Sequence, residues 1–382
     1  MKQFEFSKRL KQFPPYLFAE IDKEKVKLRK KGIDFIDLSV GDPDILCPKS
    51  VVEILWRSAK VKVNQKYALD QGKLPFKLAI KKWFKKRFTV TLDEHKEILP
   101  LIGSKEGLVH FPLAFLNPDE YVLIPSPGYP GYRGAAFFAG GKVHYMPLFS
   151  ENGFLPDLNK IPHSVRNKAK IIYLNYPNNP TTALAHREFL HTLVRFSSRY
   201  GIIIAYDNAY SELYDKEKPL SILQIPGAKE TAIEFHSLSK TFCMTGFRVG
   251  WACGNEKMIS GLFKVKTNVD SGIFGAIQDA ASYALEKENA YVHNLRRTIN
   301  ARRGIFIDSL KKKGFTDIFS ESTFYVWVKL AKGTSSIEFA KRLLVHQVVA
   351  TPGVGFGTYG EGYIRFALTV DEKKLKEALR KI

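Results

Sequence analysis

Lys240 is the residue around which the chemistry of this sequence is organised. It lies in the stretch 237–250, SLSKTFCMTGFRVG, at the end of an apolar run typical of a β-strand. Ser237 and Ser239 place hydroxyls beside the lysine, and Arg248 adds a guanidinium fork in the same stretch. Hydroxyls and a guanidinium bind phosphate, while a lysine amine can form a Schiff base with an aldehyde.

A phosphate site beside a reactive amine predicts the cofactor pyridoxal phosphate, which requires both in one place. A single lysine would ordinarily be a solvated charge, since the chain holds 59 Lys and Arg residues. The flanking hydroxyls and arginine argue against that interpretation here, as do Gly246 and Gly250, which let the backbone approach a ligand closely. The three cysteines have no metal-ligand spacing, so we expect no metal site.

A mostly parallel sheet is expected to position these groups. Short β-rich apolar runs separated by helices recur at residues 121–124, 143–147, 171–175 and 202–206. Nearly continuous apolar strands of this kind are typical of a parallel sheet covered by helices on both faces. Ligands collect at the carboxyl ends of such strands. Asp207 ends one strand, and Asn179 and Lys240 each follow another.

Two glycine turns are further candidates for binding a ligand. Gly41 ends an apolar strand and opens a turn rich in Asp and Pro, although an ordinary connection has the same local sequence. The segment 98–107, ILPLIGSKEG, reads as a strand, a Gly-Ser turn and a helix start that aims several backbone N–H groups at one point. Taken alone, the second turn is only a weak indication of phosphate binding.

The net charge of +21 raises the question of a nucleic acid or an anionic membrane as partner. The densest basic patch, residues 81–88, also carries aromatic residues at helical spacing, so we expect an ordinary helix with an aromatic core face and a wet lysine face. The other lysines are scattered, and no run approaches the ~18 apolar residues of a membrane span. We therefore expect no nucleic-acid and no membrane partner.

The length of 382 residues predicts a large domain and a smaller one. We assign residues 45–285 to the large domain and residues 286–382 to a small α+β domain that residues 1–44 complete. One long helical stretch from about 276 to 310 is expected to lead from one to the other. The odd number of cysteines and the lack of a secretory signal pattern at the start predict a cytoplasmic protein.

Several motifs in fixed order carry a resemblance to a known family. They are Asn179-Pro-Thr, Asp207-Asn-Ala-Tyr210, Ser237-Leu-Ser-Lys240, Arg248 and the arginine of Tyr363-Ile-Arg365-Phe. Together they resemble the class I/II, fold-type-I pyridoxal-phosphate aminotransferases over essentially the whole chain. The segments 14–20, 38–44, 268–274 and 352–365 look most like those of LL-diaminopimelate aminotransferases, although alanine and aspartate aminotransferases share several of them.

The resemblance implies an aspartate aminotransferase-like α/β fold with a seven-stranded-type, mostly parallel sheet, and it assigns the cofactor residues. Lys240 would hold pyridoxal 5′-phosphate as a Schiff base and move the proton between the substrate Cα and the cofactor. Asp207 would pair with the pyridine nitrogen. Tyr210 and Asn179 would hydrogen-bond the phenolic oxygen of the ring, and Tyr129 would lie against its face.

The resemblance also implies a homodimer with shared active sites. Ser237, Arg248, Ser104 and the backbone of Lys105 would hold the cofactor phosphate, together with Tyr67 of the partner subunit.

Substrate binding is assigned in the same way. Arg365 would grip the α-carboxylate in a bidentate pair, supported by Asn179 and the backbone of Gly41. For diaminopimelate, the distal ammonium would meet Asp70 across the dimer, an assignment that competes with an ordinary exposed loop aspartate. Tyr16 and Lys105 are candidates for the distal carboxylate.

The sequence thus predicts a transaminase that acts on an amino acid and a 2-oxo acid, with LL-diaminopimelate and 2-oxoglutarate as the main expectation. A general alanine or aspartate aminotransferase is the alternative. A lyase of the same fold would share nearly every cofactor residue, and a non-catalytic nucleic-acid-binding regulator is the alternative from another class. The chain departs from the family pattern at Thr182, Cys243 and Phe247, which relatives often replace by Gly, Asn and Trp.

Overall fold

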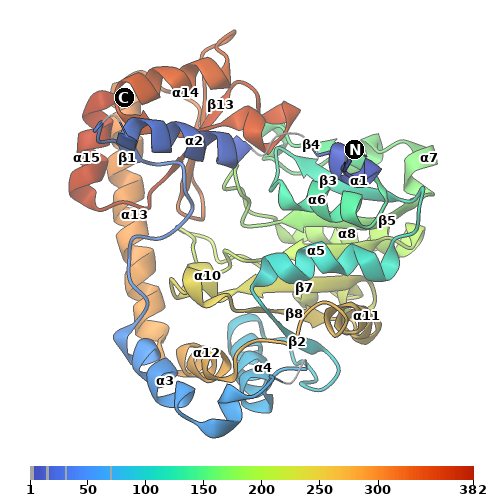
Figure 1. Cartoon of the computed structure of the whole chain (residues 1–382). Coiled ribbons are helices and arrows are strands. Elements are labelled where there is room, and N and C mark those ends of the chain that lie inside the picture. The colour runs from blue at the N-terminus through green and yellow to red at the C-terminus, as the bar shows by residue number, and fades with distance from the viewer. Residues whose placement is uncertain (1–3, 14–16, 31, 69–70) are drawn as a thin grey trace.

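A seven-stranded sheet forms the centre of the computed structural model, which describes residues 4–13, 17–30, 32–68 and 71–382 (Figure 1). Its strands run in the order β2-β8-β7-β6-β5-β3-β4. Their bounds are β2 Ile98–Leu101, β8 Gly250–Gly254, β7 Ala232–Ser237, β6 Ile203–Asp207, β5 Ala169–Asn175, β3 Tyr121–Ser126 and β4 Lys142–Pro147. β8 runs antiparallel to β2 and β7, and the other pairs of this sheet are parallel. The predicted mostly parallel sheet is confirmed.

Helices cover both faces of this sheet. One face carries α5 (Ser104–Phe115), α6 (Gly131–Phe138) and α11 (Glu256–Lys266), and the other carries α4 (Leu74–Phe88), α8 (Arg187–Tyr200) and α12 (Gly275–Lys287). Successive residues of a strand point to opposite faces. In β5, Ile171 and Tyr173 therefore join one apolar cluster, whereas Ile172 and Leu174 join the other. This double burial explains the continuous apolar strands of the sequence.

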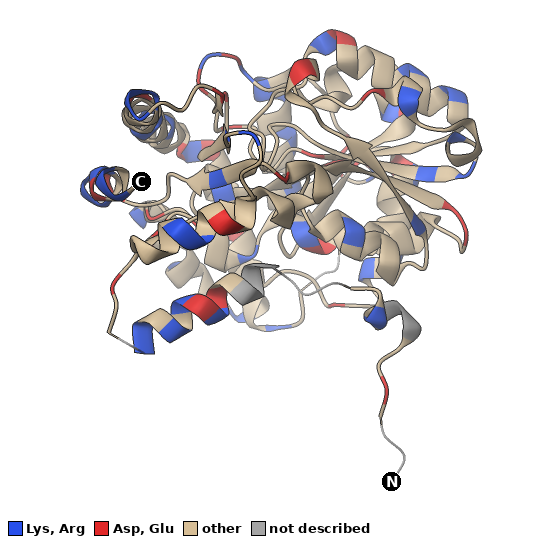
Figure 2. Ribbon diagram, turned by 90° about the horizontal axis from the view of Figure 1, so that it is seen from above, with Lys and Arg blue, Asp and Glu red and all other residues tan. Residues whose placement is uncertain are grey.

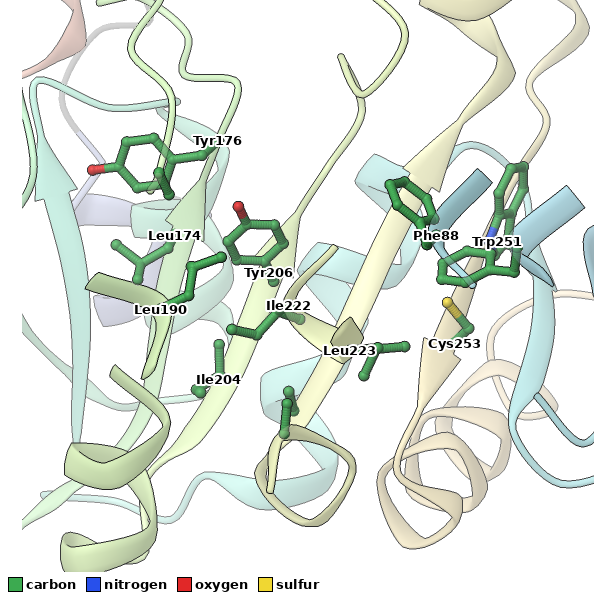
Figure 3. Packing of buried hydrophobic residues seen from close by; sticks show 14 of the residues in the cluster. Phe88, Leu174, Tyr176, Leu190, Ile204, Tyr206, Ile222, Leu223, Trp251 and Cys253 are labelled. Carbon is green, nitrogen blue, oxygen red and sulfur yellow. The ribbon is translucent and has the colours of Figure 1, made fainter. Parts of the chain in front are cut away.

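Figure 3 shows how strand and helix residues fill one of these two layers. Leu174 of β5 and Ile204 of β6 lie beside Leu190 of α8, and Ile222 of the 3₁₀ helix η4 (Ile222–Gln224) packs against them. All four side chains are completely buried. Burying an aliphatic side chain of this size contributes roughly 1.5–3 kcal/mol, so this layer holds the strand ends in place.

A second, four-stranded sheet carries the C-terminal part of the chain. Its order is β12 (Thr351–Pro352), β13 (Tyr363–Ala367), β10 (Tyr325–Lys329) and β9 (Ile318–Phe319). Nearby, β1 (Ile36–Asp37) pairs in parallel with β11 (Val348–Val349), which joins the N-terminal segment to this region. That pairing supports our grouping of residues 1–44 with 286–382, and the boundaries themselves stay a prediction.

The remaining helices complete the two layers and the connections. They are α1 Lys8–Lys11, α2 Leu17–Lys30, α3 Lys49–Ala59, α7 His163–Arg166, α9 Ala228–Thr231, α10 Leu238–Thr241, α13 Asn289–Lys312, α14 Ser336–Val345 and α15 Glu372–Lys381. Seven short 3₁₀ helices lie between them within the described residues, among them η1 (Lys62–Gln65).

The helical stretch expected from about 276 to 310 is interrupted once. The chain forms two helices, α12 and α13, which are separated at Glu288. The reason is packing, because α12 lies against α3 and α4 whereas α13 lies against α15 of the C-terminal region. One uninterrupted helix could not serve both surfaces. The carboxylate of Glu288 accepts a hydrogen bond from the hydroxyl of Ser50 at 2.5 Å, which fixes the break against α3.

The basic helix α4 has the predicted aromatic face. Phe84 and Phe88 are buried, and Trp83 packs against the same core. Lys82 and Lys85 are exposed. Figure 2 shows Lys and Arg spread over many helices with Asp and Glu among them. None of the helices in the described ranges is long and apolar enough to cross a membrane.

Candidate active site

A cavity of about 370 Å³ opens where the carboxyl ends of β5, β6 and β7 meet the first turn of α5. This volume is in the range of small-molecule sites. Eleven of the fourteen residues that the sequence assigned to cofactor or substrate line this cavity. They are Gly41, Ser104, Lys105, Tyr129, Asn179, Asp207, Tyr210, Ser237, Lys240, Arg248 and Arg365. The strands converge on one edge, so residues up to 324 positions apart meet there.

Lys240 lies in α10, the single turn of helix that follows β7. The side chain of Ser237 begins this turn by accepting a hydrogen bond from the N–H of Ser239. The Lys240 Nζ donates to the carbonyl of Gly41, so the turn after β1 closes over the amine. Burial lowers the pKa of Lys240 from 10.5 to about 8. A substantial neutral fraction near physiological pH is what a nucleophilic amine requires.

Asp207 ends β6 and is buried at the floor of the cavity. Its Oδ2 accepts a hydrogen bond from the hydroxyl of Tyr132 at 2.7 Å, and its Oδ1 accepts from the N–H of Ala209 at 3.3 Å. Burial raises the pKa of Asp207 to about 6, while these two donors favour the carboxylate and limit the rise. A buried carboxylate of this kind is suited to pair with a cationic ring nitrogen.

The first turn of α5 and Arg248 form a narrow cradle for an anion. A Cβ on Gly103 would lie 2.4 Å from Nη2 of Arg248, and a Cβ on Gly250 would lie 3.0 Å from the N–H nitrogen of Ser104. The glycines therefore leave space that any side chain would fill. Arg248 is held by a hydrogen bond from its Nη1 to the carbonyl of Thr245 at 2.8 Å.

These features fit pyridoxal phosphate. For the phosphate, the cradle offers the hydroxyls of Ser104 and Ser237, the guanidinium of Arg248 and the N-terminus of α5. The buried carboxylate lines the same cavity as the cradle and the lysine amine, so one small molecule of this kind can meet all three. The cavity thus offers partners for the phosphate, the ring nitrogen and the aldehyde of the cofactor.

The opposite wall of the cavity is built around Arg365 of β13, which is 2% exposed. Its Nη1 donates to Oδ1 of Asn179 at 2.8 Å, and its Nη2 donates to the carbonyl of Ser39 at 2.6 Å. The rings of Tyr325 and Phe356 lie 4.1 and 4.7 Å from the guanidinium carbon. A guanidinium fixed in this way is suited to bind a substrate carboxylate.

One of the expected residues, Tyr67, does not line the cavity. Tyr67 is 92% exposed and lines a separate hollow with Gly272 and Phe274. This position requires a second subunit if Tyr67 is to reach any cofactor. Tyr16 and Asp70 lie outside the described residues.

Tyr132, Asp42 and Tyr325 are among the residues of the cavity and its floor that sequence reasoning did not assign. Tyr132 lies in the first turn of α6 and its ring contacts that of Tyr129, which precedes the helix. Asp42 lines the cavity beside Gly41 and follows it directly in the chain. Tyr325 carried no local signal, because it reads as one aromatic residue of an ordinary strand.

Two of the three departures from the family pattern, Thr182 and Cys243, fall on unusual backbone. Thr182 and Cys243 adopt φ values of 67° and 53°, in the left-handed region that favours Gly or Asn. Thr182 is completely buried, and its hydroxyl accepts a hydrogen bond from the N–H of Glu321 at 3.1 Å. Burial raises the pKa of the Cys243 thiol to about 11. The thiol is therefore no nucleophile at neutral pH.

A cluster of potential metal ligands beside the phosphate cradle is occupied by a lysine. Glu106, His110 and Asp270 lie close enough to share an ion. The buried Nζ of Lys266, however, lies 3.3 Å from Glu106 and 2.7 Å from Asp270. Because this ammonium already compensates both carboxylates, the cluster serves to tie α5 to the loop before α12.

Comparison with known families places the chain among enzymes of amino-group transfer. Residues 33–382 match the family model described as "Aminotransferase class I and II". The LL-diaminopimelate aminotransferase of Aquifex aeolicus is 52% identical over 99% of this chain and 98% of its own length. That of Maridesulfovibrio salexigens is 48% identical over 100% of this chain and 99% of its own.

Solved structures have the same fold over nearly the full length. Substrate-bound BacF from Bacillus subtilis has a TM-score of 0.96 at 33% identity, over 99% of this chain and 97% of that chain. A Thermus thermophilus aspartate aminotransferase variant has a TM-score of 0.92 at 26% identity, over 99% of both chains. The aspartate aminotransferase-like fold expected from the motifs is thereby confirmed.

Proposed function

The chain belongs to the class I and II aminotransferases, and from this premise we propose that it transfers an amino group between LL-diaminopimelate and 2-oxoglutarate. In the biosynthetic direction, glutamate would donate the amino group and tetrahydrodipicolinate would accept it, in lysine and peptidoglycan precursor synthesis. The observation that carries the chemistry is a single cavity holding Lys240, Asp207, the phosphate cradle and Arg365. The substrate follows from the full-length relatives, which are named for LL-diaminopimelate.

Pyridoxal phosphate, when bound, supplies an electron sink for the electrons released at the substrate Cα. We assign Lys240 to its aldehyde and Asp207 to its ring nitrogen. With cofactor and substrate bound, the amine of Lys240 would carry the proton between the substrate Cα and the cofactor carbon. The lowered pKa of Lys240 suits this exchange, because the amine can release and accept a proton near neutral pH.

The substrate α-carboxylate is assigned to Arg365. Its side chain is fixed by Asn179 and by the carbonyl of Ser39, so the guanidinium is already oriented before substrate arrives. Asn179 and Tyr210 would also face the phenolic oxygen of the cofactor, and Tyr129 its ring face.

The distal head of diaminopimelate needs separate groups for its ammonium and its carboxylate. Lys105 lines the cavity and is assigned to the carboxylate together with Tyr16. Asp70 of the partner subunit is assigned to the ammonium. Aspartate and alanine lack this second head, so these contacts would separate the main proposal from the alternative of a general aminotransferase.

A homodimer is part of the proposal, and an apolar surface supports it. Large apolar side chains are exposed along α3, η1 and the segment next to α12. They are Val52, Trp56, Val61, Val63, Tyr67 and Phe274. Exposed apolar patches of this kind mark protein interfaces. The same surface carries the hollow of Tyr67, so a partner seated there would bring Tyr67 towards the phosphate cradle of the other subunit.

The dimer has a direct test. Trp56 is 60% exposed, and Trp56→Glu should convert the dimer to monomer in sedimentation velocity at micromolar concentration. Val345→Glu is the matched control, because Val345 is 80% exposed on α14 at the other end of the molecule. A monomeric wild-type protein, or equal behaviour of both variants, would refute this interface.

The reaction is tested by half-reactions of the purified enzyme with LL-diaminopimelate, glutamate, aspartate or alanine. The change of the visible cofactor absorbance reports amino transfer. Rapid change with LL-diaminopimelate and glutamate, and little with aspartate or alanine, is the expected result. Change with aspartate or alanine but none with diaminopimelate would favour the general aminotransferase. Formation of an oxo acid separates a transaminase from a lyase, and Lys240→Ala should abolish turnover without unfolding the protein.

The nucleic-acid-binding regulator remains the alternative from another class, favoured only by the net charge of +21. Salt-sensitive DNA binding at physiological ionic strength would support it. A cytoplasmic location is also part of the proposal. Three free cysteines in the described chain agree with a reducing compartment.

A further inference from the structure

Tyr325 joins two parts of the cavity that the proposed reaction uses separately. It is 2% exposed at the start of β10 and lines the cavity. Its ring lies 4.1 Å from the guanidinium carbon of Arg365, and its hydroxyl lies 3.2 Å from the hydroxyl of Tyr210. One side chain thus contacts both the expected carboxylate group and the expected partner of the cofactor oxygen.

The strand register accounts for the first contact. In the antiparallel pair of β10 and β13, Trp327 lies opposite Arg365 and Tyr325 lies opposite Ala367. Residues two apart on a strand share a face, so Tyr325 is the diagonal neighbour of Arg365. The ring and the guanidinium form a cation–π pair, and Phe356 covers the guanidinium at 4.7 Å.

The second contact is the hydrogen bond between the hydroxyls of Tyr325 and Tyr210, and cofactor binding defines which of them donates. The hydroxyl of Tyr210 has one hydrogen, and the proposed function requires that hydrogen to point to the cofactor oxygen. The Tyr210 oxygen then accepts, and Tyr325 is the group within reach to donate to it. Gly41 leaves room for the Tyr325 hydroxyl, because a Cβ at Gly41 would lie only 1.9 Å from it. The N–H of Tyr325 is fixed by the hydroxyl of Thr323 at 3.0 Å.

We propose that Tyr325 is a positioning residue with two functions. Its ring holds the guanidinium of Arg365 for the substrate carboxylate, and its hydroxyl turns the proton of Tyr210 into the cavity. The inference rests on the proposed aminotransferase function. It adds that carboxylate binding and cofactor tuning are coupled through one side chain. Different variants of Tyr325 can separate the two effects.

Tyr325→Phe removes the hydroxyl and keeps the ring. A hydrogen bond donated to the cofactor oxygen favours its charged form, so a weaker bond from Tyr210 raises the pH midpoint at which the visible absorbance of the holoenzyme changes. We expect a rise of about half a pH unit, the size of one ordinary hydrogen bond. The affinity for 2-oxoglutarate should stay within about twofold of wild type, because the ring remains over Arg365.

Tyr325→Leu removes both groups, and Phe356→Leu is the matched control. Tyr325→Leu should raise the midpoint and also weaken 2-oxoglutarate binding by about 3- to 30-fold, the range for a lost cation–π pair. Phe356→Leu should weaken binding and leave the midpoint unchanged, since Phe356 faces Arg365 from the 3₁₀ helix η6 (Gly353–Phe356). Thermal unfolding of each holoenzyme identifies any variant that is merely misfolded.

A double-mutant cycle completes the test. In a Tyr210→Phe background, Tyr325→Phe should cause no further shift of the midpoint, because its effect passes through Tyr210. The proposal is overturned if Tyr325→Phe leaves the midpoint at the wild-type value, or if the two shifts simply add. Its failure is distinct from that of the proposed function. If the proposed function is wrong, the wild-type enzyme gives no absorbance change with any amino acid.

Discussion

The pH dependence of cofactor capture provides a quantitative test of how the cavity prepares Lys240. Only a neutral amine attacks an aldehyde. Burial lowers the pKa of Lys240 from 10.5 to about 8. At pH 7 about one amine in eleven is then neutral, against roughly one in three thousand at the ordinary value. The cavity should accelerate capture at neutral pH by a factor on the order of three hundred, through protonation alone.

Asp42 opposes this effect and can be removed. Its carboxylate lines the cavity and raises the pKa of Lys240, because a nearby negative charge favours the ammonium form. Asp42→Asn should therefore lower the pKa below about 8. The rate at pH 7 can then rise by at most about tenfold, when every amine is neutral. Well above pH 8 the variant should gain nothing from protonation, since the wild-type amine is already neutral there.

Stopped-flow mixing of cofactor-free protein with pyridoxal phosphate between pH 6.5 and 10 measures these rates. The midpoint of the profile is the decisive quantity, because removing a negative charge also attracts the anionic cofactor equally at every pH. Asp308→Asn is the control, since it removes the same charge from an exposed position on α13 outside the cavity. A wild-type midpoint near 10.5, or a midpoint that Asp42→Asn leaves unchanged or raises, would refute the reasoning.

Further predictions concern binding, proton balance and stability. Arg365→Ala should raise KM for amino and oxo acids in steady-state kinetics, by a factor that corresponds to a loss of about 2–4 kcal/mol of binding free energy. Unchanged KM values for both would remove Arg365 from the carboxylate site. Tyr132→Phe removes a donor to Asp207, so the pKa of Asp207 rises above about 6. The acid limb of the kcat/KM profile should move to higher pH, and an identical limb would contradict this role. Thr89 ends α4 with a φ of 60° in an exposed position, and Thr89→Gly should raise the free energy of unfolding by about 1 kcal/mol in urea denaturation. A loss of stability there would show that the Thr89 side chain contributes more than its strained backbone costs.

The sequence was sufficient to locate the cavity because its residues follow strands. Asp207 ends β6, Ser237 ends β7, and both strands run parallel in the sheet. Their carboxyl ends must then lie at one edge, whatever the details of packing. Lys240 and Asn179 follow such strands within a few residues, so they reach the same edge. Residues near a strand end were thus predictable from order alone.

Residues that depend on a second molecule or on side-chain packing were not predictable in this way. Tyr67 lies at the exposed surface, and no property of a single chain decides which cofactor it meets. The break of the helical stretch at Glu288 arose for a related reason. Local sequence favours helix on both sides of that residue, and only the different packing partners of α12 and α13 separate them.

Tyr325 shows where prediction from the sequence stops and what would extend it. The strand of Tyr325 and the neighbouring strand of Arg365 were both expected, since residues 324–328 and 363–368 carry clear β patterns. The contact with Arg365 depends on their register, and a slip of one residue would turn Tyr325 to the other face of the sheet. Its contact with Tyr210 then requires that this second sheet face the carboxyl edge of the first. Order along the chain assembles the groups that react. The register between strands decides which neighbours orient them.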